Sequence, residues 1–437
     1  MEIDKTTLTD LSIFNAEEEF SIFSKLNFTT TSRGKEQLQK NLNSPLTSLD
    51  DICDVQQTIQ LLLNNMESWP RQISNGTIMV IESFFESTID PIPSQSSSFS
   101  AYSYKLLHAP DFSLVKYSTG HCFDFIKGVQ ILVNNFRGNI PRPLKNLLDN
   151  AEKLISRPQF EIIAKNKLPG DITIAELLQL GHYIRYQYKR QIQELIQFYS
   201  QMDAWYSMAK AVKTYDLVFP EIKDSVKPFI ESEGLYHILL NEPVAYDVTL
   251  NEKTNFLFLT GANMAGKSTF IKAIGSAVFL AHAGMGVPAK KMTISVFDGM
   301  LSNINVIDNI VKGESYFYNE VQRIKSTITK INDGRKWLIL IDELFKGTNI
   351  QDAMKCSSTV IEGLLKINRS LFILSTHLYE IGEALQKHPN IIFNYFETTI
   401  TGDQLEFNYQ LKEGISNDRL GYLILKQEGV VKMLEDL

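Results

Sequence analysis

The feature that most constrains the fold of this chain is the stretch LTGANMAGKSTF at residues 259–270. It carries the spacing Gly-x-x-x-x-Gly-Lys-Ser, follows the apolar run 256–258 and precedes a helical stretch at 268–283. A strand, a glycine-rich turn and a helix in this order are typical of phosphate-binding loops, because glycines let main-chain N–H groups face an anion. We therefore predict a nucleotide-binding loop here; the alternative is a glycine turn with an exposed lysine.

The residues of this loop would meet different parts of a nucleotide. Lys267 would reach the β- and γ-phosphates, Ser268 would hold Mg²⁺, and Thr269 would lie near the α-phosphate. The predicted cofactors are ATP and Mg²⁺. The predicted binding residues are Gly261, Ala262, Asn263, Met264, Ala265, Gly266, Lys267, Ser268 and Thr269.

Two further apolar runs end in polar residues. Residues 337–343 place Asp342 and Glu343 at the carboxyl end of a buried strand, where open α/β sheets bind ligands. Asp342 would bind the metal directly or through water, and Glu343 would polarise the attacking water. His377 ends another run and could contact the γ-phosphate or that water. Taken alone, the acidic pair and the histidine would more often be ordinary surface groups. Together with the phosphate-loop pattern, as three strand ends of one sheet, they favour catalysis by Glu343 and His377.

The pattern of apolar residues changes near residue 235. Before it the pattern is helical, and we expect helices at 11–26, 35–42, 49–66 and from Ile172 to about Tyr215. The last begins with the capping box Thr173-x-x-Glu176 and would be a rod of roughly 60 Å. A long core helix in a bundle and a mechanical lever both fit this pattern.

After residue 235 short apolar runs alternate with helical stretches such as 353–365. This alternation predicts a mostly parallel sheet flanked by helices. The expected strands lie at 256–259, 337–341, 371–374 and 391–393.

Composition and charge say little about whether the protein binds nucleic acid or a membrane. The net charge of −7 gives no support for nucleic-acid binding, but it does not exclude a local basic patch, because phosphate contacts need only a few placed Lys and Arg side chains. No apolar run reaches the ~18 residues of a membrane span, and residues 1–10 are too polar for a signal peptide. We expect a cytoplasmic protein that does not enter a membrane.

Several of these segments resemble the ATPase domain of the MutS DNA mismatch-repair family. They are Leu240-Asn-Glu-Pro243, 261–269 with its inner Asn263-Met264, Gly286-Val-Pro-Ala289, 342–348 and 375–377. The segment from Thr29, TTTSRGKEQLQKNLNSPL, is similar to the entry of that family's helical core domain. The resemblance implies an α/β P-loop NTPase of the ABC type at 236–437, with an N-terminal all-α core and lever domain at 1–235.

The resemblance also implies a homodimer in which two ATPase domains face each other. Gly313-Glu-Ser315 would complete the partner's nucleotide site, with Ser315 donating to the γ-phosphate from a helix start. Asn263 would contact phosphate within its own chain, and Tyr409 matches the position of a ring that stacks on adenine. Residues 414–430 resemble the closing helical segment, which packs across the dimer. DNA is the expected partner by resemblance alone.

Three departures from the family pattern leave the catalytic groups in place. They are Ala262 in the loop, Tyr316 after the signature serine and Phe345-Lys346 after the acidic pair. The helical pattern begins near residue 10, which leaves no room for the family's mismatch-wedge domain. We therefore expect an ATP-dependent DNA-binding ATPase in DNA repair or DNA-structure sensing. A nucleotide-gated protein scaffold without DNA binding and a small-molecule phosphotransferase remain as alternatives.

Overall fold

Contacts between residues divide the chain into two units. The computed structural model describes residues 1–94, 97–136, 138, 140–305, 316–401, 404–416, 425–426 and 429–435. The helical unit comprises Leu26–Asn43 and Asp54–Lys213, and the sheet unit comprises Met1–Lys25, Ser44–Cys53 and Thr214–Leu437. The contacts thus follow a different division from a single boundary near residue 235, because two N-terminal segments pack with the C-terminal half.

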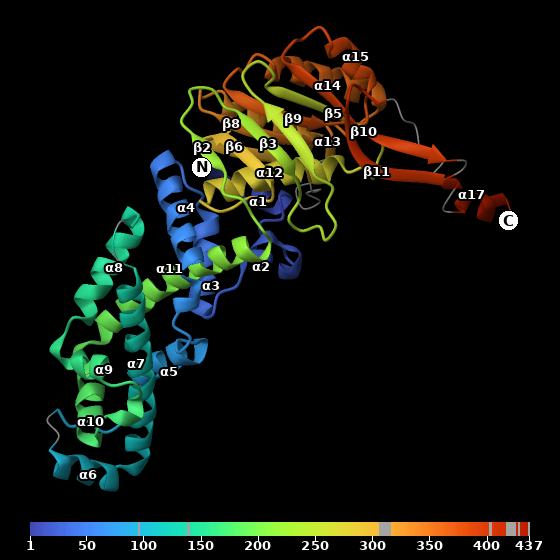
Figure 1. Cartoon of the computed structure of the whole chain (residues 1–437). Helices are drawn as coiled ribbons and strands as arrows, with labels where there is room; N and C mark the ends of the chain where they lie inside the picture. Colours follow the sequence, from blue (N-terminus) through green and yellow to red (C-terminus); the bar gives the residue numbers. More distant parts are fainter. Residues whose placement is uncertain are drawn as a thin grey trace. The chain divides into compact units, whose positions relative to one another are not determined.

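The helical unit is built from α-helices, and 3₁₀ turns lie in several of the connections between them (Figure 1). Ser74 and Thr77 form a capping box at the start of α5. Among the described residues, no helix is both long and apolar enough to span a membrane. The helix bounds are α3 Ser32–Asn43, α4 Leu49–Asn64 (shared with the sheet unit), α5 Asn75–Glu86, α6 Ser98–Leu107, α7 Ala109–Asn135, α8 Arg142–Ile155, α9 Glu161–Lys165, α10 Ile174–His182 and α11 Lys189–Thr214.

The predicted helix from Ile172 to about Tyr215 is helical but not continuous. The capping box of Thr173 and Glu176 starts α10, a π-helical turn occupies Tyr183–Gln187, and α11 then begins. Packing accounts for the interruption, because the rings of Tyr183 and Tyr188 stack with centroids 5.1 Å apart. A π turn hydrogen-bonds residues five apart and so brings these two side chains together. The expected single rod is therefore two helices.

A buried carboxylate on α11 fixes the entry to α3. Asp203 is 0% exposed and accepts hydrogen bonds from the main-chain N–H groups and the hydroxyls of Thr30 and Thr31, at 2.8 to 3.1 Å. Burial raises the pKa of this carboxyl although the four donors oppose the shift. A Cβ atom on Gly34 would lie 2.1 Å from Asp203 Oδ2, so only glycine fits beside the carboxylate.

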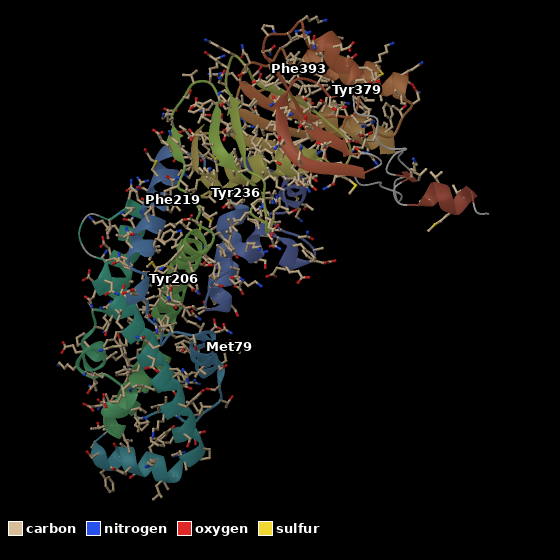
Figure 2. All side chains as sticks on the ribbon, turned by 45° about the vertical axis from the view of Figure 1, so that its right-hand side comes forward. Met79, Tyr206, Phe219, Tyr236, Tyr379 and Phe393 are labelled. Atoms are coloured by element: carbon tan, nitrogen blue, oxygen red, sulfur yellow. The ribbon has the colours of Figure 1, made fainter. Side chains whose placement is uncertain are left out.

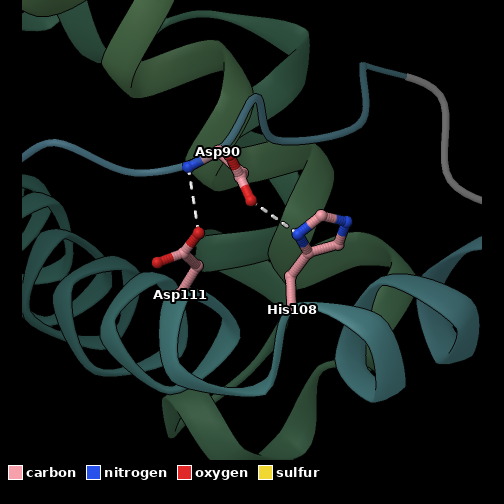
Figure 3. Close-up of side chains that lie close together, drawn as sticks. All are labelled: Asp90, His108 and Asp111. Carbon is pink, nitrogen blue, oxygen red and sulfur yellow. Dashed lines mark hydrogen bonds and ion pairs between the residues drawn. The ribbon is translucent and has the colours of Figure 1, made fainter.

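Aromatic and polar contacts hold other parts of the helical unit. Tyr206 on α11, labelled in Figure 2, stacks on Trp69 with ring centroids 4.1 Å apart. Figure 3 shows that Asp90, in the connection between α5 and α6, contacts two residues at the start of α7. His108 Nδ1 lies 2.7 Å from Asp90 Oδ2, and Asp90 N–H donates to Asp111 Oδ2 at 3.0 Å. These contacts hold the segment between α5 and α6 against the start of α7.

The sheet unit contains a seven-stranded sheet in the order β1-β7-β8-β9-β5-β10-β11. All neighbours pair in parallel except the β10–β11 hairpin. The predicted, mostly parallel sheet flanked by helices is confirmed. A second sheet has the order β2-β6-β3-β4. The strand bounds are β1 Glu2–Ile3, β2 Glu221–Lys223, β3 Ile230–Leu235, β4 Tyr246–Leu250, β5 Phe256–Thr260, β6 Lys291–Ser295, β7 Gly299–Asn303, β8 Trp337–Asp342, β9 Ser370–Ser375, β10 Ile391–Thr401 and β11 Gln404–Glu413.

Helices cover both faces of the large sheet (Figure 1). Every residue of β5, β7, β8 and β9 is buried, as expected for a parallel sheet covered on both sides. Trp337, Ile339 and Ile341 of β8 share a core with residues of α13 and α14. An added Cβ on Gly275 of α12 would lie 2.5 Å from Leu340 Cδ1, so α12 packs closely on the other face. The helix bounds are α1 Lys5–Asp10, α2 Ile22–Leu26, α12 Lys267–His282, α13 Tyr316–Ile331, α14 Ile350–Leu364, α15 Glu380–Leu385 and α17 Val430–Glu435.

The expected helix over 11–26 is wrong. Ser12 has a φ of 55°, which ends α1, and α2 begins only at Ile22. Main-chain N–H groups of Ile22 and Phe23 donate to the carbonyls of Ser12 and Ile13, so the chain folds back on itself. Leu11, Ile13, Ile22, Phe23 and Leu26 are buried in this folded-back arrangement rather than along one helical face, and Phe20 is 56% exposed.

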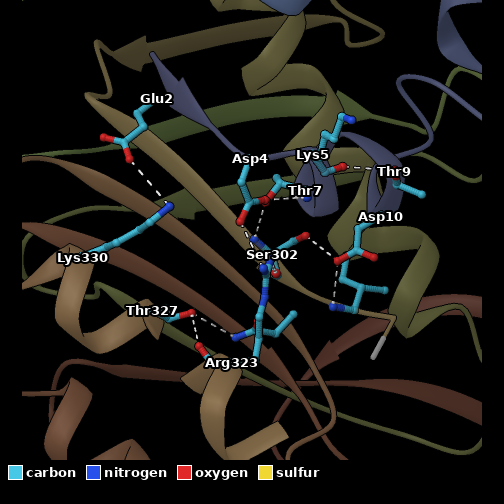
Figure 4. Close-up of polar contacts among 12 residues, drawn as sticks. Glu2, Asp4, Lys5, Thr7, Thr9, Asp10, Ser302, Arg323, Thr327 and Lys330 are labelled. Atoms are coloured by element: carbon cyan, nitrogen blue, oxygen red, sulfur yellow. Dashed lines mark hydrogen bonds and ion pairs between the residues drawn. The ribbon is translucent and has the colours of Figure 1, made fainter. Parts of the chain in front are cut away.

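The N-terminal segment joins the edge of the large sheet (Figure 4). β1 pairs with β7, and Asp10 at the end of α1 accepts hydrogen bonds from Ser302 Oγ at 2.5 Å and from Ile304 N at 3.1 Å. Arg323 of α13 donates to Asp4 Oδ2 at 3.1 Å and to Ser302 O at 2.6 Å. Residues 302–305 and α13 are therefore tied to α1.

Candidate functional site

The glycine loop, residues 261–268, joins the end of β5 to α12. Gly261 and Gly266 have φ values of 140° and 104°, which side chains rarely permit. A Cβ on Gly266 would lie 3.2 Å from Tyr409 Cδ1, so glycine also lets that ring approach the backbone. Gly266 is the N-cap of α12 and no side chain caps this helix. The first N–H groups of α12 can therefore bind an anion.

Lys267, the first residue of α12, is 5% exposed. Its Nζ donates to Gly261 O at 2.8 Å and to Ala262 O at 2.9 Å. Burial lowers the pKa of this ammonium group, and the charges of Glu343 and Asp342 oppose that shift. The loop's own carbonyls thus hold a cation that can exchange them for the oxygens of a bound anion.

Asp342, the last residue of β8, is 7% exposed and is held by two hydroxyls. Ser268 Oγ donates to Oδ2 at 2.5 Å, and Ser375 Oγ donates to Oδ1. The parallel register of β8 and β9 pairs Asp342 with Ser375, and the start of α12 brings Ser268. Hydroxyl and carboxylate oxygens are the hard ligands that Mg²⁺ prefers, so this donor set fits the predicted metal residues Ser268 and Asp342.

Glu343 follows β8 in a left-handed backbone conformation, with a φ of 61°. Its Oε2 lies 3.2 Å from Lys346 Nζ and 3.6 Å from His377 Nδ1, and the second distance is an ion-pair contact beyond hydrogen-bond range. Burial alone would raise the pKa of this carboxyl, but the contact with His377 and the charge of Lys346 lower it to about 2. Glu343 is therefore ionised at neutral pH.

The glycine loop borders a cavity of about 430 Å³, within the range of small-molecule sites. Gly261, Ala262, Ala265, Asp342 and His377 do not line it, although the last two contact residues that do. Eight of the predicted residues line it: Asn263, Met264, Gly266, Lys267, Ser268, Thr269, Glu343 and Tyr409.

Part of the cavity wall comes from residues that the sequence reasoning did not assign to the site. They follow β3 and begin β4: His237, Leu240, Glu242, Val244 and Tyr246. The ring of Tyr246 packs edge-on against Phe270 of α12, with centroids 5.1 Å apart. Only the resemblance of 240–243 pointed to this stretch, which has no glycine pattern and no catalytic residue pair.

The predicted partner-facing residue Ser315 lies outside the described residues, as do residues 417–424 and 427–428 of the closing segment. Glu320, on α13, is 5% exposed and accepts hydrogen bonds from Lys346 N at 3.2 Å and Gly347 N at 3.4 Å. Burial raises the pKa of this carboxyl, against the effect of those N–H groups. Glu320 thus ties α13 to the loop that follows Glu343.

Residues 257–434 match the family model described as MutS domain V. This range begins within β5 and contains the glycine loop, Asp342, Glu343 and His377. This part of the chain is therefore similar to MutS domain V. A DNA mismatch repair protein MutS from Petrotoga mobilis is 27% identical over 304 residues, which cover 69% of this chain and 35% of that relative.

Two other DNA mismatch repair proteins are similar to this chain at the same level of identity. The DNA mismatch repair protein MutS of Staphylococcus haemolyticus is 27% identical over 295 residues, covering 64% of this chain and 32% of the relative. DNA mismatch repair protein spellchecker 1 of Drosophila melanogaster is 27% identical over 241 residues, covering 52% and 25%. The chain therefore spans about a third or less of the length of these MutS relatives. The wall formed by 237–246 precedes the range matched to MutS domain V.

Proposed function

We propose that this chain binds ATP with Mg²⁺ in the cavity beside the glycine loop, hydrolyses it, and couples the nucleotide state to binding of DNA. One observation carries the proposal. A buried ammonium group, a set of oxygen donors for a divalent ion and an ionised carboxylate lie together at the carboxyl ends of the central strands. They are Lys267, the pair Ser268–Asp342, and Glu343. Phosphoryl transfer depends mainly on positioning and charge stabilisation, which these groups supply.

In the proposed complex the triphosphate lies along the glycine loop. The main-chain N–H groups of the loop and of the α12 N-terminus donate to phosphate oxygens, and Lys267 exchanges its two carbonyl partners for them. Ser268 and Asp342 would hold Mg²⁺, which when bound neutralises charge on the β- and γ-phosphates. Asn263 adds a phosphate contact. The ring of Tyr409 is assigned to the nucleobase.

Glu343 is assigned to the attacking water. A carboxyl whose pKa is about 2 is a weak base at neutral pH, so its main effect is to orient the water, and it takes the proton as the bond to phosphorus forms. His377, whose side chain is 52% exposed, contacts Glu343 from the next strand end and is assigned to the γ-phosphate or the same water.

The partners follow from the family. The relatives carry names of DNA mismatch repair proteins, which supports DNA as the partner and a role in DNA repair or DNA-structure sensing. The resemblance assigns completion of each nucleotide site to Gly313–Ser315 of a second copy. ATP turnover per chain should then rise with protein concentration and level off once dimers predominate. A flat profile across the monomer–dimer range would count against shared sites.

The decisive test of the assigned chemistry is Glu343→Gln. We expect ATP affinity within about twofold of wild type and turnover lower by about 10²–10⁴-fold, the usual effect of removing a positioned base. Glu383→Gln is the matched control, because Glu383 is an exposed carboxylate on α15 that does not line the cavity. Turnover in Glu343→Gln equal to the control would remove Glu343 from this role.

DNA binding is tested separately. Affinity for a DNA duplex is measured with and without a non-hydrolysable ATP analogue at several salt concentrations. Contacts to phosphates must weaken steeply as salt rises, and coupling requires the analogue to change the affinity. Salt-independent or absent binding in both states would favour a protein scaffold instead.

A further inference from the structure

His237 borders the candidate cavity, and the mechanism above gives it no task. It follows β3 and is 7% exposed. Leu239 N–H donates to its Nδ1 at 3.3 Å. Its Nε2 is enclosed by protein atoms and has no hydrogen-bond partner among the described residues.

The protonation of this imidazole follows from its surroundings. Burial and the charge of Lys272 lower the pKa of His237 to about 4, so the ring is neutral at pH 7. Since Nδ1 accepts the Leu239 N–H, the single ring proton belongs on Nε2. His237, a residue that borders the cavity, therefore carries an enclosed N–H donor with no acceptor among the described residues, and a buried donor without an acceptor is unfavourable.

The other wall residues indicate which part of a nucleotide lies nearby. Leu240 and Val244 are apolar, Tyr246 and Tyr409 present aromatic rings, and Glu242 adds a carboxylate, which disfavours a neighbouring phosphate. Such a surface suits a base and its sugar rather than phosphate. The phosphate-binding groups of the cavity instead belong to the glycine loop and the first turn of α12.

We propose that His237 donates a hydrogen bond from Nε2–H to an acceptor on the nucleoside half of the bound nucleotide, either a ring nitrogen of the base or a ribose oxygen. His237 is then an affinity-determining residue of the site. This inference rests on the proposed nucleotide binding. Because Nε2 is enclosed, the imidazole must rotate as the ligand enters.

Two substitutions at His237 distinguish the role of Nδ1 from that of Nε2. His237→Asn keeps an acceptor near the Nδ1 position for Leu239 N–H but has no group at Nε2. His237→Gln places an amide N–H near the Nε2 position. Isothermal titration calorimetry with Mg²⁺ measures affinity for ATP and for inorganic tripolyphosphate, which has no nucleoside. Thermal unfolding checks that both variants fold.

We expect His237→Asn to weaken ATP binding about five- to tenfold, the usual value of one hydrogen bond, and His237→Gln to stay within about threefold of wild type. Tripolyphosphate binding should not change in either variant. Equal ATP affinity in wild type and His237→Asn would overturn the proposal. So would a matching loss for tripolyphosphate, which would show a structural effect.

Nucleotide analogues identify the acceptor. If it is the ribose 2′-hydroxyl, 2′-deoxy-ATP should bind the wild type as weakly as ATP binds His237→Asn. If it is a ring nitrogen, 2′-deoxy-ATP should bind normally and one deaza analogue of ATP should show the loss. Failure of the wild type to bind both ATP and tripolyphosphate would instead refute nucleotide binding itself.

Discussion

Replacing Asp203 with alanine is expected to destabilise the helical unit by about 4 kcal/mol. The carboxylate is fully buried and accepts from four donors, the N–H groups and hydroxyls of Thr30 and Thr31. Each buried donor left without an acceptor costs about 1–3 kcal/mol, and we take the low end because the hydroxyls can turn to other partners. With a typical urea dependence of about 2 kcal/mol per molar, the unfolding midpoint should fall by about 2 M.

Tryptophan fluorescence can follow the unfolding of the helical unit separately from that of the sheet unit. Trp69 and Trp205 lie in the helical unit and Trp337 in the sheet unit, so a Trp337→Phe background reports on the helical unit alone. Asp203→Asn, which keeps one oxygen acceptor, should show a smaller loss. Asp149→Ala, an exposed aspartate on α8, is the control and should change stability by less than about 0.5 kcal/mol. A midpoint for Asp203→Ala equal to that of the control would refute the assigned role.

Two further predictions concern the site. Gly266→Ala should destabilise the sheet unit by about 1–3 kcal/mol and weaken ATP binding, since its φ is 104° and Tyr409 lies close. Calorimetry and thermal unfolding should show neither loss in Gly363→Ala, an open position in α14. The Glu343 carboxyl, whose pKa falls from 4.5 to about 2 on folding, should stabilise the protein by up to about 3 kcal/mol above pH 4.5, and this is lost as pH falls towards 2. Urea unfolding of wild type and Glu343→Gln should therefore converge over that range; a constant difference would contradict the assigned ionisation.

Elements with strong local patterns could be predicted from the sequence. The apolar runs at 256–259 and 337–341 became β5 and β8, because a fully buried parallel strand is apolar at every position. The prediction of a helix over 11–26 failed because Ser12 adopts a left-handed conformation that no local sequence pattern indicates. The prediction of one continuous helix before and through α11 failed for a similar reason, because the stacking of Tyr183 on Tyr188 is a packing effect.

The candidate site was predictable where one segment carries its own chemistry. The glycine loop and the pair Asp342–Glu343 are of this kind, and Ser268 and Asp342 do meet in the structure. The position of His237 on the cavity wall was not predictable, because it depends on the path of the chain between β3 and β4. The contact of Lys346 with Glu343 likewise needs the loop conformation after β8.

The central claim is that the glycine loop and Lys267 capture a triphosphate. Its most direct test is calorimetric titration of ATP with Mg²⁺ into wild type, Lys267→Ala and the control Lys366→Ala, an exposed lysine outside the cavity. The account predicts saturable binding by wild type and the control, and an affinity at least about tenfold weaker in Lys267→Ala. Equal affinities in all three proteins, or no binding by folded wild type, would contradict it.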